Sequence, residues 1–358
     1  MARTRIGVDV GSTAVRVAEV VVGDIPVVVR AAQVHLPPGV VEAGEVRQPE
    51  AVADALRDVW AKSGVQSKQA HLGVGNQRVV VREIALPWLP EKELRDTLAF
   101  QVQEFIPMAS DEVVLDFDPL GELDQGGRRM VRILLVAAHK AMVNALVEAA
   151  LAAKLDPQGI DLAPFAVIRA VGTGDEGLDL DSSGDEAIID IGAQVTSICV
   201  HDRGVTRFVR ILPSGGRDIT LALASGLGVD HDMAERLKRG ERVEVEEEGA
   251  TPLPEAAEIR ELALTRAGSF VDEVRSALAF YTAQMPEAQI GRVLVVGGGS
   301  RLDGLLELLQ ERLPVPVDRG RLFERAKSEI ELSAEASAEA EAVLSVAVGL
   351  AIPTRRQA

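Results

Sequence analysis

"IGVDVGSTAVRV", residues 6–17, places an aspartate near the end of an apolar run that otherwise has the pattern of a buried strand. Ile6, Val8 and Val10 alternate as in a β-strand, and a turn of small residues precedes the next apolar run. A carboxylate buried in a sheet is costly unless a partner stabilises its charge or its pKa rises until it is neutral. Asp9 therefore indicates a metal or phosphate site, although capping of a hairpin turn is the commoner role for a single aspartate.

The same pattern returns in the second half of the chain. Residues 187–200, "AIIDIGAQVTSICV", again run from an apolar strand through an aspartate, a glycine and a short turn into a second apolar strand. A third strand is expected after each unit, at residues 26–35 and 204–213. The chain therefore indicates two similar halves with Asp9 and Asp190 in equivalent turns, and this repetition weakens the explanation by turn capping alone.

Charge and composition exclude several classes of protein. The 358 residues carry a formal net charge of −17, which argues against a nucleic-acid partner and against unaided docking on anionic lipid. Cys199 is the only cysteine, so there is no disulfide framework. The longest uncharged apolar run, residues 342–352, is too short to span a bilayer. We therefore expect a cytoplasmic protein without direct membrane insertion.

Apolar periodicity predicts the elements around these turns. Helices are expected at residues 49–64, 216–240 and 255–285. Residues 86–155 have the pattern of a compact α/β insertion, whose first helix must end before Pro107. The core of this insertion is expected to contain the apolar residues Phe100, Val102, Phe105 and Ile106. Two acidic stretches, residues 172–186 and 241–249, are expected to be a flexible loop and solvated surface.

A third segment, "RVLVVGGGSRLDG" at residues 292–304, leads from a strand through three glycines into a helix. Glycines allow a backbone to approach a flat base or ribose closely, although a glycine run is usually only a flexible connection. The two aspartate turns offer backbone N–H groups to phosphate oxygens, and their carboxylates suit Mg²⁺. The three segments together indicate a site for a metal-bound nucleotide.

In this order, the three segments resemble the phosphate 1, phosphate 2 and adenosine motifs of the actin, heat-shock-chaperone and sugar-kinase ATPase superfamily. The insertion sequence "LPEKELRDTLAFQVQEFIPMASDEVVLDFDPL", residues 89–120, is similar to the FtsA-type 1C subdomain of the PilM family, the actin-like proteins of type IV pilus assembly. The last helix, "SVAVGLA", resembles the second connecting motif. The resemblance implies an α/β actin-like ATPase fold of two lobes, each with a duplicated mixed sheet flanked by helices.

The resemblance also implies a division into subdomains. These are 1A (residues 1–85 and 156–185), 1C (86–155), 2A (186–215 and 291–340), 2B (216–290) and a C-terminal helix (341–358) that returns to 1A. ATP and Mg²⁺ would bind in the cleft between the lobes, with Asp9 and Asp190 as metal ligands.

Candidate nucleotide-binding residues follow from the resemblance by position. They are Asp9, Gly11, Ser12, Thr13 and Arg16 at the first turn, Asp190, Gly192 and Thr196 at the second, Glu235 and Lys238 near the ribose and base, and Gly297, Gly298, Gly299 and Ser300 beside the adenosine. Arg16 stands where relatives usually carry a lysine, and it has an alternative role as a solvated strand residue. Glu235 and Lys238, one helical turn apart, have an alternative role as an exposed ion pair.

Two departures from the superfamily pattern bear on activity. Gln194 stands at the second glycine of the phosphate 2 pattern, and Ala163 stands where active chaperone-like relatives often place a water-positioning glutamate. Asp161 lies two residues too early to replace that glutamate. Because phosphoryl transfer depends on positioning, we expect nucleotide binding with slow or no ATP hydrolysis.

The resemblance implies a cytoplasmic scaffold at the inner face of the cell membrane, held there by a partner. That partner would be a PilN-like protein whose short N-terminal tail docks near the insertion. The resemblance also implies other pilus inner-membrane components as partners, and self-association of the chain. An FtsA-like division protein is the first alternative, but its usual C-terminal membrane helix has no counterpart in "AIPTRRQA". A small-molecule kinase is the second, and the sequence offers no convincing catalytic base for it.

Overall fold

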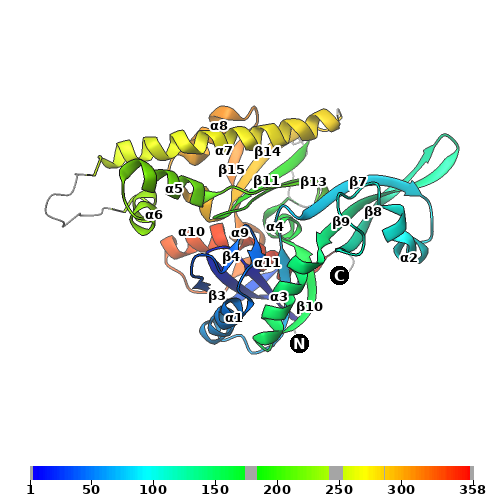
Figure 1. The fold of residues 1–358 in the computed structure, drawn as a ribbon, viewed down its shortest axis with the longest axis horizontal. Coiled ribbons are helices and arrows are strands. Elements are labelled where there is room, and N and C mark those ends of the chain that lie inside the picture. The colour runs from blue at the N-terminus through cyan, green and yellow to red at the C-terminus, as the bar shows by residue number, and fades with distance from the viewer. Residues whose placement is uncertain (1–2, 174–183, 242–252, 286, 355–358) are drawn as a thin grey trace.

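The computed structural model describes residues 3–173, 184–241, 253–285 and 287–354, arranged as two lobes with a lateral insertion (Figure 1). Each lobe is built on one large mixed sheet. Of the two acidic stretches, residues 174–183 and 242–249 lie outside the described residues, whereas Asp185 and Glu186, expected in a flexible loop, begin a strand. Within the described ranges, no helix is both long and apolar enough to cross a bilayer.

The first lobe contains a six-stranded sheet in the order β10–β6–β1–β2–β3–β16. Its strands are β1 (Thr4–Val10), β2 (Ala14–Val21), β3 (Val27–His35), β6 (Gln69–Val74), β10 (Asp156–Leu162) and β16 (Lys327–Ser328). Helices α1 (Pro49–Ser63) and α3 (Lys140–Ala152) cover one face, and α4 (Ala163–Val171) and α11 (Ser345–Ala351) cover the other. Valine, leucine and alanine fill both layers, and burial of this apolar surface stabilises the lobe.

The second lobe contains a five-stranded sheet in the order β13–β12–β11–β14–β15. Its strands are β11 (Asp185–Ile191), β12 (Thr196–Asp202), β13 (Val205–Leu212), β14 (Ile290–Val296) and β15 (Val317–Arg319). Helices α5 (Gly216–Leu227), α6 (His231–Lys238), α7 (Ala256–Gln284) and α8 (Leu305–Arg312) pack with it. The long α7 runs along the outer side of the lobe in Figure 1 and buries Phe270, Val274 and Tyr281 in the core.

The insertion extends to the side of the first lobe as a three-stranded antiparallel sheet, β7–β9–β8, with one helix (Figure 1). Its elements are β7 (Val79–Pro87), α2 (Glu91–Gln101), β8 (Val113–Gln125) and β9 (Arg128–His139). The paired sheet thus starts at Val79, and the following α3 packs against α1 of the first lobe. Strand β7 also lies beside β13 of the second lobe, so the insertion touches both lobes.

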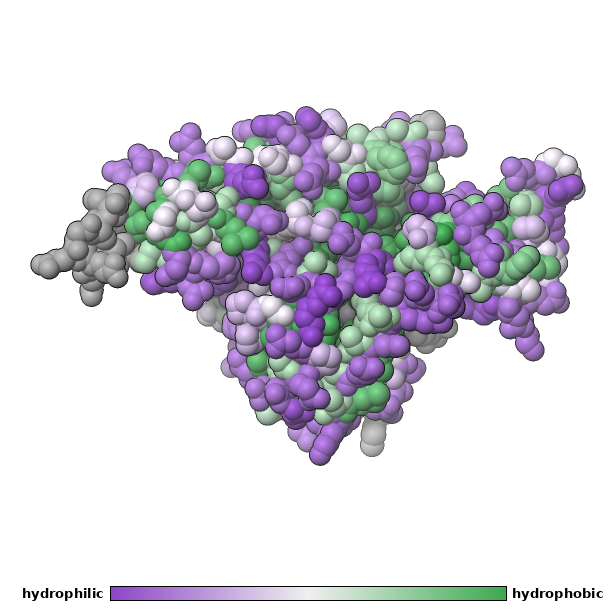
Figure 2. All heavy atoms as spheres, in the orientation of Figure 1, coloured by the Kyte–Doolittle hydropathy of each residue, from purple (hydrophilic) through white to green (hydrophobic). Residues whose placement is uncertain are grey.

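The insertion core differs in one respect from the expectation. Val102 and Ile106 are buried and Phe105 packs against them, but Phe100 is 80% exposed. The helix ends at Gln101, earlier than a continuous pattern up to Pro107 suggested. The turn after Gln101 rotates Val102 and Ile106 toward the sheet, and Phe100 remains on the outer face. Figure 2 shows a largely hydrophilic surface on this side of the molecule, with hydrophobic side chains visible over the insertion.

Short elements complete the two lobes and the return of the chain to the first. They are the hairpin β4 (Val41–Glu42) and β5 (Glu45–Val46), the 3₁₀ turn η1 (Gly298–Arg301), α9 (Leu322–Arg325) and α10 (Ala334–Val343). Strand β16 pairs with β3, so the chain reaches the first-lobe sheet at Lys327, ahead of the final helix. The subdomain boundaries given above remain a prediction.

Candidate functional site

The two aspartate turns, which follow Asp9 and Asp190, have the same local geometry, and each follows the carboxyl end of a central strand. The Gly11 amide donates to the Ala14 carbonyl oxygen at 3.0 Å, and the Gly192 amide donates to the Val195 carbonyl oxygen at 2.9 Å. In both hairpins the aspartate stands two residues before this glycine. The duplicated unit predicted from the sequence is therefore present in the structure.

The carboxylates of Asp9 and Asp190 lie close enough to influence each other across the two lobes. Burial, and after it the negative charge of Asp9, raise the pKa of Asp190 to about 7. Burial also raises the pKa of Asp9, against the opposing effect of the Arg16 guanidinium. Two carboxylates that repel each other in a partly enclosed site form an arrangement that a divalent cation would stabilise.

Arg16 is part of this site and is not a solvated strand residue. Its Nη1 donates to Asp9 Oδ2 at 3.2 Å, and the Arg16 and Asp9 side chains are only 15% and 18% exposed. The buried Nε of Arg16 has no hydrogen-bond partner among the described residues. A buried donor without an acceptor costs ~1–3 kcal/mol, so an anionic oxygen placed beside it would be stabilised.

The acidic pair and Arg16 together fit a metal-bound phosphate. In the part of the chain that the structure describes, no three His, Cys, Asp or Glu side chains gather as a metal site would require. An ion between Asp9 and Asp190 would therefore take its remaining ligands from phosphate oxygens and water, which Mg²⁺ commonly does. Gly11 lies against the same arginine, since a Cβ at this position would come within 3.3 Å of Arg16 Nη1.

The other candidates of the first turn, Ser12 and Thr13, lie at its tip. Ser12 is partly exposed and Thr13 is exposed, and the Thr13 carbonyl accepts a hydrogen bond of 2.9 Å from the Leu36 amide. This bond ties the turn to the end of β3. Because both residues keep some solvent exposure, a ligand could reach them.

The second turn is fastened to the start of α5. The Gly216 amide donates to the Gly192 carbonyl at 3.0 Å, and the Arg217 amide donates to the Ala193 carbonyl at 2.8 Å. The Thr196 hydroxyl donates to the Ser214 carbonyl at 2.8 Å, and Thr196 is fully buried. Its hydroxyl therefore holds the loop before α5, and the structure does not leave it facing the cleft.

The glycine run packs directly against the Asp190 end of β11. A Cβ at Gly297, whose φ is +85°, would collide with Asp190 Oδ1 and the Ile191 carbonyl, and a Cβ at Gly299 would collide with the Ile191 side chain. Gly298 is exposed, whereas Ser300 is buried and its hydroxyl donates to the Gly297 carbonyl at 2.7 Å. The glycines thus permit a close backbone approach, and Ser300 stabilises the turn from inside.

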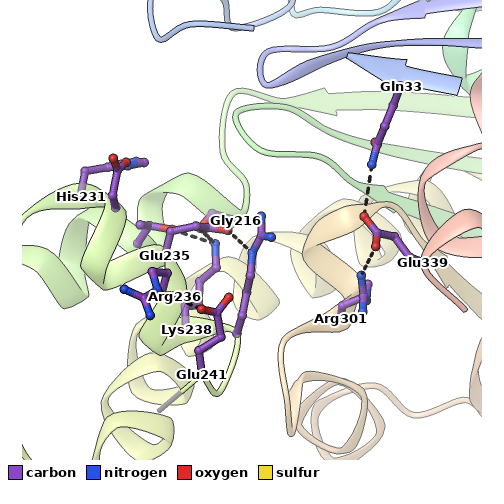
Figure 3. A network of polar contacts seen from close by, with 12 residues as sticks. Gln33, Gly216, His231, Glu235, Arg236, Lys238, Glu241, Arg301 and Glu339 are labelled. Atoms are coloured by element: carbon purple, nitrogen blue, oxygen red, sulfur yellow. Dashed lines mark hydrogen bonds and ion pairs between the residues drawn. The ribbon is translucent and has the colours of Figure 1, made fainter. Parts of the chain in front are cut away.

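Glu235 and Lys238 form a compact network with the start of α5 (Figure 3). Lys238 Nζ donates to Glu235 Oε2 at 2.6 Å, to the Thr220 hydroxyl at 2.7 Å and to the Gly216 carbonyl at 3.0 Å. The Lys238 side chain is 13% exposed, so this is not a solvated ion pair. Burial opposes ionisation of Glu235, but the Lys238 charge and the hydrogen bonds together lower its pKa.

This network meets the glycine run. A Cβ at Gly216 would lie 3.6 Å from both Gly299 Cα and Lys238 Nζ, and 3.7 Å from the Gly192 carbonyl. Segments far apart in the sequence therefore converge at the N-terminus of α5. The sequence pattern did not single out Gly215 and Gly216, although the small-residue pair before a helix was a usable signal.

Two contacts that involve residues absent from the predicted site join parts of the cleft. Gln194 Oε1 accepts a hydrogen bond of 2.7 Å from the amide of Ala43, at the tip of the β4–β5 hairpin. Glu339 of α10 accepts from Gln33 Nε2 of β3 at 3.2 Å and pairs with Arg301 at 3.7 Å (Figure 3). The departure at Gln194 thus creates a side-chain contact from the second turn to the first lobe.

At the position where active chaperone-like relatives often place a water-positioning glutamate, this chain has Ala163, and Asp161 two residues earlier is paired. Asp161 Oδ2 accepts from Arg169 Nη2 at 2.5 Å, and its Oδ1 accepts from the Leu162 amide at 2.7 Å. Ala163 faces Gly75, where an added Cβ would lie 3.2 Å from the Ala163 Cβ. Asp161, the carboxylate that lies closest to Ala163 in the sequence, is therefore already engaged by a guanidinium and an amide.

Comparison with known proteins agrees with this architecture. The family model described as type IV pilus assembly protein PilM matches residues 7–355. A chain of the PilM–PilN type IV pilus biogenesis complex is 27% identical, with a TM-score of 0.81 and coverage of 97% of both chains. The ethanolamine utilization protein EutJ from Carboxydothermus hydrogenoformans is 17% identical, with a TM-score of 0.58 and coverage of 98% of this chain and 90% of EutJ.

Two further proteins are similar to the chain, one in fold and one in part of its sequence. MreB5 of Spiroplasma citri bound to ADP is 13% identical, with a TM-score of 0.52 and coverage of 97% of this chain and 94% of MreB5. Cell division protein FtsA of Bacillus subtilis is 27% identical over 184 residues, which are 51% of this chain but only 39% of FtsA. The expected actin-like fold is confirmed, and the chain belongs to the PilM family of type IV pilus assembly proteins.

Proposed function

We propose that this protein is a cytoplasmic scaffold of the type IV pilus inner-membrane complex that binds Mg·ATP between its lobes with slow or no hydrolysis. The proposal of nucleotide binding rests on the electrostatic interaction of the Asp9 and Asp190 carboxylates, one from each duplicated half of the chain. Beside them stands Arg16, whose buried Nε has no hydrogen-bond partner among the described residues. When bound, the metal would neutralise this acidic pair and the phosphates. The convergence of Gly216, Gly299 and Lys238 supports a base and ribose site on the second lobe.

Slow hydrolysis is supported by the surroundings of Ala163. The nearest carboxylate in the sequence, Asp161, is already paired with Arg169 and bonded to the Leu162 amide. A base that activates water must reach it within hydrogen-bond distance, and an alanine side chain at position 163 cannot do this. The site is therefore better suited to holding nucleotide than to turning it over.

The partner proposal is a PilN-like protein whose N-terminal tail docks beside the insertion. Its support is the full-length similarity to a chain solved as a PilM–PilN complex. The insertion touches both lobes, through α3 on one side and the β7–β13 contact on the other. Movement of the lobes around a nucleotide would therefore reach the insertion, and the two ligands would influence each other's affinity.

Calorimetry with Mg·ATP tests the nucleotide site. Arg16→Ala should weaken binding about tenfold or more, since it removes a charged donor from the phosphates. Arg30→Ala is the matched control, because Arg30 pairs with Glu19 at 2.6 Å on the same sheet without contacting the acidic pair. Undetectable ATP binding by the unaltered protein, or equal weakening by both substitutions, would contradict the assignment.

Titration with a PilN-tail peptide, with and without Mg·ATP, tests the partner. We expect measurable binding whose affinity differs between the two nucleotide states. Absence of binding in both states would remove the PilN proposal and leave the nucleotide site untouched. The similarity to FtsA over half of the chain supports a second candidate function, that of an FtsA-like membrane-associated protein. Sedimentation with lipid vesicles in the absence of any partner would favour that candidate.

A further inference from the structure

Asn76 is a buried polar residue that the predicted nucleotide site does not include. It follows the carboxyl end of β6, and its side chain is fully buried. Its Oδ1 accepts a hydrogen bond of 2.8 Å from the Arg78 amide, which fixes the orientation of the carboxamide, because a flipped group would place two donors together. Its Nδ2 has no hydrogen-bond partner among the described residues.

The register of the sheet places Asn76 at the cleft. Strands β1, β6 and β10 are parallel, with Val8 level with Leu72 and Leu162 level with Val74. Their carboxyl ends therefore lie at one edge, so that Asn76 follows its strand beside the first aspartate turn and the start of α4. In open sheets of this kind, ligands bind at the carboxyl ends of the strands.

The neighbours of Asn76 connect it with the second turn as well. A Cβ at Gly44 would lie 3.0 Å from the Asn76 Cβ, so the tip of the β4–β5 hairpin packs on this residue. The adjacent Ala43 donates to Gln194 of the second turn. Asn76 therefore lies close to elements from both turns and belongs to the first lobe, whereas the cluster of Gly216, Gly299 and Lys238 belongs to the second.

We propose that the Asn76 carboxamide is a positioning residue that donates, directly or through one water molecule, to the terminal phosphate of a bound nucleoside triphosphate. The proposal rests on the proposed nucleotide function. A nucleotide whose base and ribose lie by Lys238 and whose metal lies between Asp9 and Asp190 extends its last phosphate toward this edge. The donor then distinguishes a triphosphate from a diphosphate, since only the triphosphate supplies an acceptor there.

Asn76→Asp is the sharpest test, because the aspartate keeps the acceptor for the Arg78 amide and replaces the unpartnered N–H donor with a negatively charged oxygen that repels a phosphate. We expect at least a tenfold loss of affinity for Mg·ATP and a change of less than twofold for Mg·ADP, both measured by calorimetry. Asn144→Asp, at an exposed position on α3, is the matched control and should change neither affinity. Asn76→Ser, which retains a short acceptor for the turn, serves as a second variant if the aspartate lowers thermal stability.

The outcomes test the role of Asn76 separately from the proposed nucleotide binding. Selective loss of ATP affinity in both Asn76 variants supports the positioning role. Equal changes for ATP and ADP, or no change for either, overturn it while the nucleotide site stands. If the unaltered protein binds neither nucleotide, the proposed function fails, and the role of Asn76 fails with it. A crystal structure with a non-hydrolysable ATP analogue provides an independent readout, and an Asn76 carboxamide without contact to the terminal phosphate or its water would also overturn the role.

Discussion

Replacement of Asp190 by asparagine should change how the stability of the protein depends on pH. The pKa of Asp190 is raised from an ordinary value of 3.8 to about 7, first by burial and then by the charge of Asp9. The native state therefore binds one more proton than the unfolded chain between these two pH values. Because stability rises with pH only where the unfolded state binds more protons, this carboxyl makes stability fall as pH rises from ~4 to ~7.

The size of the effect follows from the same two values. One unit of pKa difference corresponds to ~1.4 kcal/mol, so Asp190 destabilises the nucleotide-free protein by at most ~4 kcal/mol above pH 7. Partial exposure of the carboxyl and screening by salt reduce this figure. Asparagine keeps the shape and cannot ionise, so D190N should be more stable than the unaltered protein at pH 8 and equally stable near pH 4.

Urea denaturation at several pH values between 4 and 8.5, without metal or nucleotide, measures this difference. D9N should move the fall in stability to lower pH, because it removes the neighbouring charge and leaves Asp190 to titrate. Asp318→Asn, at an exposed position on β15, is the control and should follow the unaltered protein. If D190N and the unaltered protein show the same pH dependence, the two carboxylates are not coupled as described, and the metal site loses its main support.

Four further substitutions test three features of the structure. Gln194→Gly removes the acceptor of the Ala43 amide, and a hydrogen bond worth ~1 kcal/mol implies about fivefold faster hydrogen exchange of that amide; unchanged exchange would contradict the contact. Gly297→Ala forces a side chain into a left-handed backbone against Asp190, which should cost at least ~2 kcal/mol in urea denaturation, and a neutral result would refute the close packing. Phe100→Ser should change stability by less than ~0.5 kcal/mol while Val102→Ala costs more than ~1 kcal/mol, and the reverse order would contradict their assigned exposure.

The parts of the fold that sequence reasoning predicted well depend on short-range patterns. The strands around Asp9 and Asp190 were evident because apolar runs, a glycine and small turn residues lie within a dozen positions. The helix of residues 49–63 was equally evident, since its apolar spacing and the stop at Gly64 are local signals. Local signals of this kind are enough to recognise a duplicated unit, and the presence of that unit reduces the number of folds that the chain could adopt.

Other features depend on tertiary packing that no local pattern contains. Phe100 has the spacing of a core residue, yet the helix ends one residue later and the following chain fills the core instead. Thr196 fits the phosphate 2 pattern, but its hydroxyl donates a hydrogen bond to a backbone carbonyl in the loop before α5. Asn76 gave no signal in the sequence, because its burial depends on a hairpin more than thirty positions away in the chain.

The two departures from the superfamily pattern act in the same direction on this site. Under the proposed function, an alanine in place of a water-positioning acid at position 163 would slow turnover, so a bound nucleotide would stay longer in the cleft. Gln194 adds a hydrogen bond from the second turn to Ala43 of the first lobe, where a glycine has no side chain to make it. A site that retains its nucleotide and carries its own contact to the first lobe can hold one lobe arrangement for the lifetime of that nucleotide. Such persistence suits a scaffold whose insertion touches both lobes, because a docked partner then meets a stable surface and not one that changes with each hydrolysis event.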